Sequence, residues 1–172
     1  MTTKPVSKSP IGVFDSGLGG LTVLTALEKM LPNESFLYFG DTAHVPYGSK
    51  SADTVARYSH DIVDFFLMHN TKAVVIACNT ASAVACQELR NSYNIPLFDV
   101  VEPSVAHSNN ISITRSIGVI GTQSTIYSGA YKQSFLDLKS DCCVIEIACP
   151  LFVPIIEEGW SDMPVAETIA NT

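Results

Sequence analysis

The sequence of 172 residues has one tryptophan, only 16% charged residues and no two cysteines in a CxxC arrangement. Its cysteines are odd in number: Cys78, Cys86, Cys142, Cys143 and Cys149. That count and spacing are typical neither of a disulfide framework nor of a zinc site. We therefore expect a cytoplasmic protein with reduced thiols and no metal.

Long apolar runs and an excess of basic residues are also missing. The most apolar stretch, residues 142–156, is too short to span a bilayer and is interrupted by Glu146, Pro150 and Pro154. The first ten residues lack the apolar segment of a signal peptide. Ten basic residues against 17 acidic ones give a net charge of −7, which repels phosphate backbones. We expect neither a membrane nor a nucleic acid as a partner.

The chain does contain enough apolar residues for a packed core, because 47% of its residues are hydrophobic. Periodicity predicts strands at 11–14, 36–39, 73–77, 96–100, 116–120 and 142–148, and helices at 21–31, 51–70, 80–93 and 122–138, with a short helix after residue 103. This alternation is typical of βαβ units with parallel strands. Because the pattern restarts near Glu102 and Pro103, we predict two doubly wound, parallel-sheet α/β domains, residues 1–101 and 102–172, with the active site between them.

Polar residues follow the first three predicted strands, at the ends where ligands bind in open α/β sheets. These polar segments begin at Asp15, Gly40 and Cys78, and we expect all three on one rim. The glycine-rich run 17–20 fits neither GxGxxG nor the Walker pattern, so we interpret it as a tight turn that needs positive φ. Asp15 is either the N-cap of the next helix or a functional carboxylate.

Cys78 is the strongest candidate for a reactive group. It ends a strand and precedes a helix, where unpaired N–H groups and the helix dipole lower a thiol pKa. Asn79 and Thr80 beside it can donate hydrogen bonds to a carboxylate. The other four cysteines are predicted to be core residues. His44 either approaches a ligand or is a surface residue of its loop, and the other histidines lack metal-ligand spacing.

Five segments that include these residues resemble those of the glutamate racemase family, within the cofactor-independent aspartate/glutamate racemase superfamily. They are residues 12–21, 40–48, 77–83, 118–125 and 148–159, in the family's order and with suitable spacing. The resemblance implies an isomerase that interconverts L- and D-glutamate without a cofactor and supplies D-glutamate for peptidoglycan. It also implies glutamate as the partner and a homodimer for the full-length protein.

The resemblance further assigns roles to residues. It implies that Cys78 is one of two thiols that remove and donate the substrate α-proton on opposite faces, with the carboxylates of Asp15 and Glu157 nearby. It implies substrate-binding positions at Asp15, Ser16, Tyr47, Gly48, Asn79, Thr80, Thr122 and Thr125.

The family's second catalytic cysteine belongs to a Cys-Thr-His motif downstream of the last matching segment, and these 172 residues contain no such motif. We therefore expect the chain to end before either domain is complete and to be inactive alone. The alternatives are another racemase of the superfamily, acting on aspartate or hydantoin, a one-cysteine decarboxylase, or a non-catalytic glutamate-binding fragment.

Overall fold

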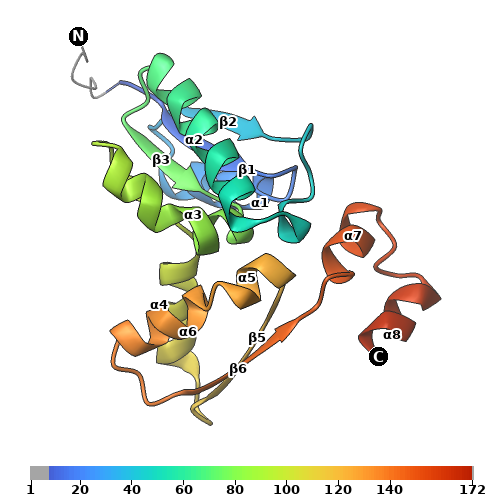
Figure 1. The fold of residues 1–172 in the computed structure, drawn as a ribbon. Helices are drawn as coiled ribbons and strands as arrows, with labels where there is room; N and C mark the ends of the chain where they lie inside the picture. The colour runs from blue at the N-terminus through green and yellow to red at the C-terminus, as the bar shows by residue number, and fades with distance from the viewer. Residues whose placement is uncertain (1–7, 172) are drawn as a thin grey trace.

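Two parallel β-sheets organise the computed structural model, which describes residues 8–171. One sheet has four strands in the order β2-β1-β3-β4, and the other pairs β5 with β6. Figure 1 shows the first sheet with its helices as an upper lobe and the second sheet with its helices as a lower lobe. The predicted α/β class with parallel sheets is therefore confirmed.

The first sheet and its helices come from the first hundred residues. Its elements are β1 (Ile11–Asp15), α1 (Leu21–Met30), β2 (Phe36–Gly40), the 3₁₀ turn η1 (Tyr47–Ser49), α2 (Ala52–Met68), β3 (Ala73–Ile76), α3 (Asn79–Ser92) and β4 (Leu97–Phe98). In Figure 1, α1 lies behind the sheet, and α2 and α3 lie in front of it. The chain thus leaves β1 and β3 toward opposite faces, so a topological switch point lies between these two strands.

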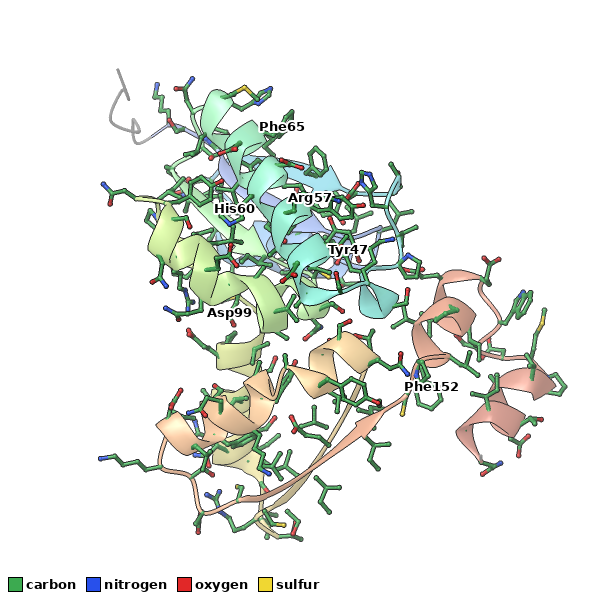
Figure 2. The ribbon with its side chains drawn as sticks, viewed as in Figure 1. Tyr47, Arg57, His60, Phe65, Asp99 and Phe152 are labelled. Atoms are coloured by element: carbon green, nitrogen blue, oxygen red, sulfur yellow. The ribbon has the colours of Figure 1, made fainter. Side chains whose placement is uncertain are left out.

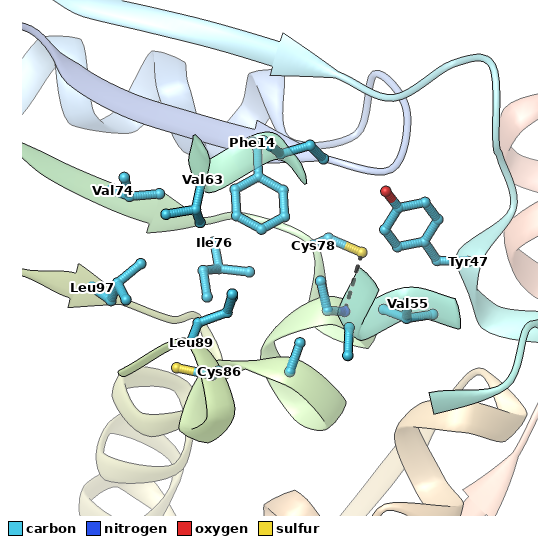
Figure 3. Packing of buried hydrophobic residues seen from close by; sticks show 14 of the residues in the cluster. Phe14, Tyr47, Val55, Val63, Val74, Ile76, Cys78, Cys86, Leu89 and Leu97 are labelled. Atoms are coloured by element: carbon cyan, nitrogen blue, oxygen red, sulfur yellow. Dashed lines mark hydrogen bonds between the residues drawn. The ribbon is translucent and has the colours of Figure 1, made fainter. Parts of the chain in front are cut away.

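The main core lies between this sheet and helices α2 and α3. Ser51 begins α2 as its N-cap, accepting a hydrogen bond from the Thr54 N–H. The apolar face of α2 then packs against α3 and the strands, as the periodicity predicts. Phe14, Phe66 and Leu89 are completely buried in this cluster, which Figure 3 shows from close by.

The second sheet is smaller and is covered on one face. The elements of this lobe are α4 (Val101–Ile111), β5 (Ser116–Gly121), α5 (Gln123–Tyr127), α6 (Ala130–Asp137), β6 (Cys143–Ala148), α7 (Phe152–Glu157) and α8 (Pro164–Ala170). Val101, Val105 and Phe135 of α4 and α6 form a second buried cluster against the sheet. Ile120 and Ile145 remain more than half exposed. The domain boundary at residues 101 and 102 stays a prediction.

Two predicted elements differ from those observed. The helix predicted over 122–138 is two helices, because Gly129 adopts a left-handed φ of 66° between them. The strand predicted over 96–100 has only two residues. It stops because the Asp99 carboxylate turns back to accept hydrogen bonds from the N–H groups of Val101 and Glu102, which begins α4.

The prediction that four cysteines are core residues is correct for Cys86 only. Cys143 is exposed, and Cys142 and Cys149 are half-buried. Cys143 is exposed because β6 is covered on one face, so alternate side chains of the strand point away from the core. Cys142, just before the strand, packs against the second buried cluster. Among residues 8–171, no helix is long and apolar enough to cross a membrane.

Candidate functional site

The loops after β1, β2 and β3 meet at one rim of the first sheet, as predicted. The Asp41 N–H donates to the Asp15 carbonyl over 2.9 Å, which joins the first loop to the second. The Tyr38 hydroxyl donates to the Gly17 carbonyl over 3.0 Å. Because the loops follow neighbouring parallel strands on both sides of the switch point, their side chains face a common space.

Cys78 lies at the start of α3 and serves as its N-cap. Its sulfur accepts a hydrogen bond from the Ala81 N–H over 3.5 Å, drawn in Figure 3. The thiol donates to the Ser16 hydroxyl, also over 3.5 Å, which connects it to the first rim loop. Only 5% of Cys78 is exposed, and Figure 3 shows the Tyr47 ring beside its sulfur.

The prediction that the pKa of Cys78 is lowered is wrong for this site. Burial raises the pKa of the thiol, and the nearby Asp15 carboxylate raises it further. The hydrogen bonds from Ala81 and Ser16 act in the opposite direction but do not compensate. The site therefore favours the protonated thiol, and a positive charge brought near it would favour the thiolate.

Asp15 is not the N-cap of α1, since that position belongs to Gly20, which makes no side-chain cap. Its Oδ2 instead accepts a hydrogen bond from the Gly17 N–H over 3.0 Å, and the residue is only 8% exposed. The glycine run is not a positive-φ turn either, because no glycine in it has positive φ. A Cβ on Gly20 would lie 2.5 Å from the Asp15 Cβ, so glycine is needed there for close approach.

The second rim loop is held by the carboxylate of Asp41, whose partners the sequence did not predict. The Tyr47 hydroxyl donates to Asp41 Oδ2 over 2.6 Å, and His44 Nδ1 lies 2.8 Å from Oδ1. Burial and this bond raise the pKa of Tyr47. His44 also stacks on Tyr58, with 4.1 Å between ring centroids. Since the Tyr47 hydroxyl is engaged by Asp41, it holds the loop in place beside Cys78.

Residues of the second lobe reach the same rim. The hydroxyls of Thr80, Thr122 and Thr125 form a triangle with sides of 3.0, 3.3 and 2.9 Å. The Ser124 hydroxyl lies 3.0 Å from the Gly48 carbonyl and 2.8 Å from that of Lys50. Figure 1 shows α5, which carries Ser124, directly below η1. These contacts join the two lobes at the rim.

Glu157, at the end of α7 in the second lobe, approaches the first rim loop. Its Oε1 would lie 3.5 Å from a Cβ built on Gly17. Burial raises the pKa of Glu157, and the charges of Asp15 and Glu158 add to the increase. Figure 2 labels Phe152, the first residue of α7, to the lower right of the upper lobe. The structure thus brings together candidate residues that lie up to 142 positions apart, from Asp15 to Glu157.

Asp15 lies close enough to both Cys78 and Glu157 to influence their ionisation. The hydroxyl of Ser16 contacts the thiol, and Asn79 and Thr80 follow it in the chain. The negative groups favour a cationic group such as an ammonium, and the donors favour a carboxylate. Such a set of groups suits acid–base chemistry on a small zwitterion. Within residues 8–171, no cluster of three or more His, Cys, Asp or Glu side chains is arranged to hold a metal ion.

The chain is thus an α/β protein that brings a thiol and carboxylates together at the switch point of its first sheet. Comparison with known proteins makes this specific. The model of the Asp/Glu/Hydantoin racemase family matches residues 11–172, and the chain belongs to this family.

The relatives found by sequence are glutamate racemases. The chain is 51% identical over 164 residues to the protein of Thermus thermophilus, covering 95% of this chain and 60% of the relative. It is 48% identical over 162 residues to that of Geobacter metallireducens, covering 94% and 60%. The chain thus spans about three fifths of the length of these relatives.

Solved structures give the same result. The crystal structure of Thermus thermophilus glutamate racemase in complex with β-chloro-D-alanine is similar with a TM-score of 0.83 and 49% identity, covering 98% of this chain and 61% of that one. The Francisella tularensis enzyme in complex with D-glutamate is similar with a TM-score of 0.86 and 40% identity, covering 96% and 62%.

Proposed function

We propose that the product of this gene interconverts L- and D-glutamate and supplies D-glutamate for peptidoglycan, with Cys78 as one of two acid–base thiols. The observation that carries the proposal is the position of Cys78, at the N-terminus of α3 and in hydrogen-bond contact with Ser16. The similarity to glutamate racemases of Thermus thermophilus and Geobacter metallireducens supports glutamate as the substrate.

The charges of the site support binding of an amino acid in a fixed orientation. The ammonium group would lie near Asp15 and Glu157, because a cation offsets the repulsion between these two carboxylates. The substrate carboxylates would accept hydrogen bonds from Ser16, Asn79 and Thr80. The backbone of Tyr47 and Gly48 and the hydroxyls of Thr122 and Thr125 complete the proposed binding set.

The arriving ammonium also gives Cys78 the positive charge that its ionisation needs, and the thiol releases its proton to solvent as the substrate binds. Ionised Cys78 takes the α-proton from one face, and its sulfur becomes a thiol. The electron pair left on the α-carbon is delocalised into the substrate carboxylate, which the surrounding N–H and O–H donors stabilise. A second donor must deliver a proton to the opposite face, and the family's Cys-Thr-His motif is the proposed source.

The proposal is tested by exchange of the α-proton. The full gene product should convert L-glutamate to D-glutamate in D₂O without added cofactor, with deuterium entering at the α-carbon, as followed by circular dichroism and mass spectrometry. Cys78→Ser should slow exchange by a factor of about a thousand or more while the glutamate dissociation constant changes little. Cys143→Ser, which alters an exposed cysteine far from the rim loops in sequence, is the matched control.

Three outcomes would separate the alternatives. Exchange on aspartate or a hydantoin but not on glutamate indicates another racemase of the superfamily. Glutamate binding without exchange in the full gene product indicates a binding protein. The 172 residues alone should bind weakly and show no racemisation, and full activity from them would contradict the two-thiol assignment. We place the protein in the cytoplasm as a homodimer, which cell fractionation and light scattering test.

A further inference from the structure

Tyr131 of α6 reaches the first lobe through a hydrogen bond to the side chain of Asn79. Its hydroxyl donates to Asn79 Oδ1 over 2.6 Å, across 52 positions of sequence. Asn79 is exposed and immediately follows Cys78, whereas the Tyr131 ring is half-buried against the cluster of Val105 and Phe135. The phenol is therefore fixed by packing, and the amide is held by the phenol.

The contact determines which way the amide faces. An asparagine amide is planar and carries its acceptor oxygen and its NH₂ group, with two donors, on opposite sides of the Cβ–Cγ bond axis. A separation of 2.6 Å lies within the range for an O–H···O bond but below the usual 2.7–3.2 Å for N–H···O. Burial, together with the charge of Asp99, raises the pKa of Tyr131, so the phenol keeps the proton that it donates. The amide oxygen thus faces Tyr131, and the amide nitrogen is left to donate elsewhere.

We propose that Tyr131 is a positioning residue that orients the Asn79 amide so that its N–H groups donate to the substrate carboxylate. This inference rests on the proposed function and extends it. Without the phenol, the amide can rotate and present its oxygen to the substrate, and two facing acceptors repel each other. Tyr131 also couples substrate binding to the position of α6, because the hydroxyl that orients Asn79 comes from the second lobe.

The test combines Tyr131→Phe, Asn79→Ala and the double variant in the full gene product. Tyr131→Phe keeps the ring that packs against Phe135 and should raise the KM for both glutamate enantiomers about fivefold, the factor expected from one hydrogen bond of ordinary strength. The kcat should change less than twofold. Because Tyr131 acts through Asn79, the double variant should have the KM of Asn79→Ala alone.

Tyr127→Phe is the matched control, because this tyrosine is 79% exposed on neighbouring α5, and its KM should equal that of wild type. An unchanged KM in Tyr131→Phe, or a KM in the double variant that reflects both single changes added together, would overturn the inference about Tyr131. The proposed function would stand in either case, provided that the wild type racemises glutamate. Calorimetric titration with glutamate repeats the comparison as a dissociation constant, at temperatures below the melting of each variant. Wild-type protein that neither binds nor exchanges glutamate would contradict the proposed function itself.

Discussion

Gly48→Ala adds one methyl group at the point where η1 meets α5. A Cβ on Gly48 would lie 2.4 Å from Thr122 Cγ2 and 2.5 Å from Thr122 Cβ, about 1 Å short of the 3.4 Å at which ordinary contact begins. Rotation of the threonine side chain cannot move its Cβ, so the backbone of one lobe must retreat. Gly48 does not have positive φ, and the change therefore acts by steric overlap alone.

This backbone displacement should lower both the stability of the protein and the activity of the site. Overpacking of this size destabilises a protein by about 1–3 kcal/mol, which corresponds to a fall in Tm of roughly 2–12 °C for a chain of this length. Ser124 holds the Gly48 carbonyl, and Thr122 contacts Thr80, so a shift of about 1 Å is transmitted to groups beside Cys78. Misplacement of reacting groups by about 1 Å can lower the rate by a factor of about a hundred.

Gly118→Ala is the control, because no atom lies within 4 Å of a Cβ built there. Differential scanning calorimetry and the deuterium-exchange assay are run on both variants and on wild type. We expect Gly118→Ala to retain its exchange rate, and Gly48→Ala to lose both Tm and kcat/KM. If Gly48→Ala matches the control in both measurements, the two lobes are not held in contact at Thr122 and the reasoning is refuted.

Two further predictions concern thiols. Iodoacetamide at pH 7 should label exposed Cys143 before Cys78, because burial and a raised pKa suppress the Cys78 thiolate. Mass-spectrometric mapping that finds Cys78 labelled first would contradict this electrostatic reasoning. Burial raises the pKa of Cys86 from 9.0 to about 12 in the folded protein. The stability that the buried thiol contributes is therefore complete below pH 9 and is lost as the pH rises toward 12, because the unfolded chain ionises first. Chemical denaturation of wild type and Cys86→Ala across this range should show a steeper decline in wild type, and parallel curves would refute it.

The parts of the site that sequence could predict are those fixed by local pattern. The third strand and the helix after it place Cys78 at a helix start, and the parallel sheet brings the polar strand ends to one rim. Both follow from periodicity and from the geometry of βαβ units. The Asp99 turn that shortens β4 and the left-handed Gly129 that divides a helix depend on single residues, and periodicity averages over them.

The interactions that sequence missed are those that depend on tertiary packing. Nothing near Tyr131 indicates that its hydroxyl meets Asn79 across 52 positions. Likewise, the pairing of Asp41 with His44 and Tyr47 depends on how the second rim loop folds over α2, although all three residues lie within one short segment. The close approach of Gly20 to Asp15 has the same origin, because only the tertiary fold shows that a Cβ would collide there.

The error about the pKa of Cys78 shows how the chemistry depends on packing. Sequence identifies the helix N-terminus, whose N–H groups lower a thiol pKa, but burial and the Asp15 carboxylate outweigh it. Under the proposed function this balance is useful, because racemisation needs one thiol protonated as the acid while the other is ionised as the base. A thiol whose raised pKa keeps it protonated holds the proton that it must donate in one direction, and the positive charge of a bound ammonium favours the thiolate that acts as the base in the other. A lowered pKa would disfavour the protonated thiol that must donate in one direction, so the Asp15 carboxylate, by opposing ionisation, helps Cys78 to keep that proton.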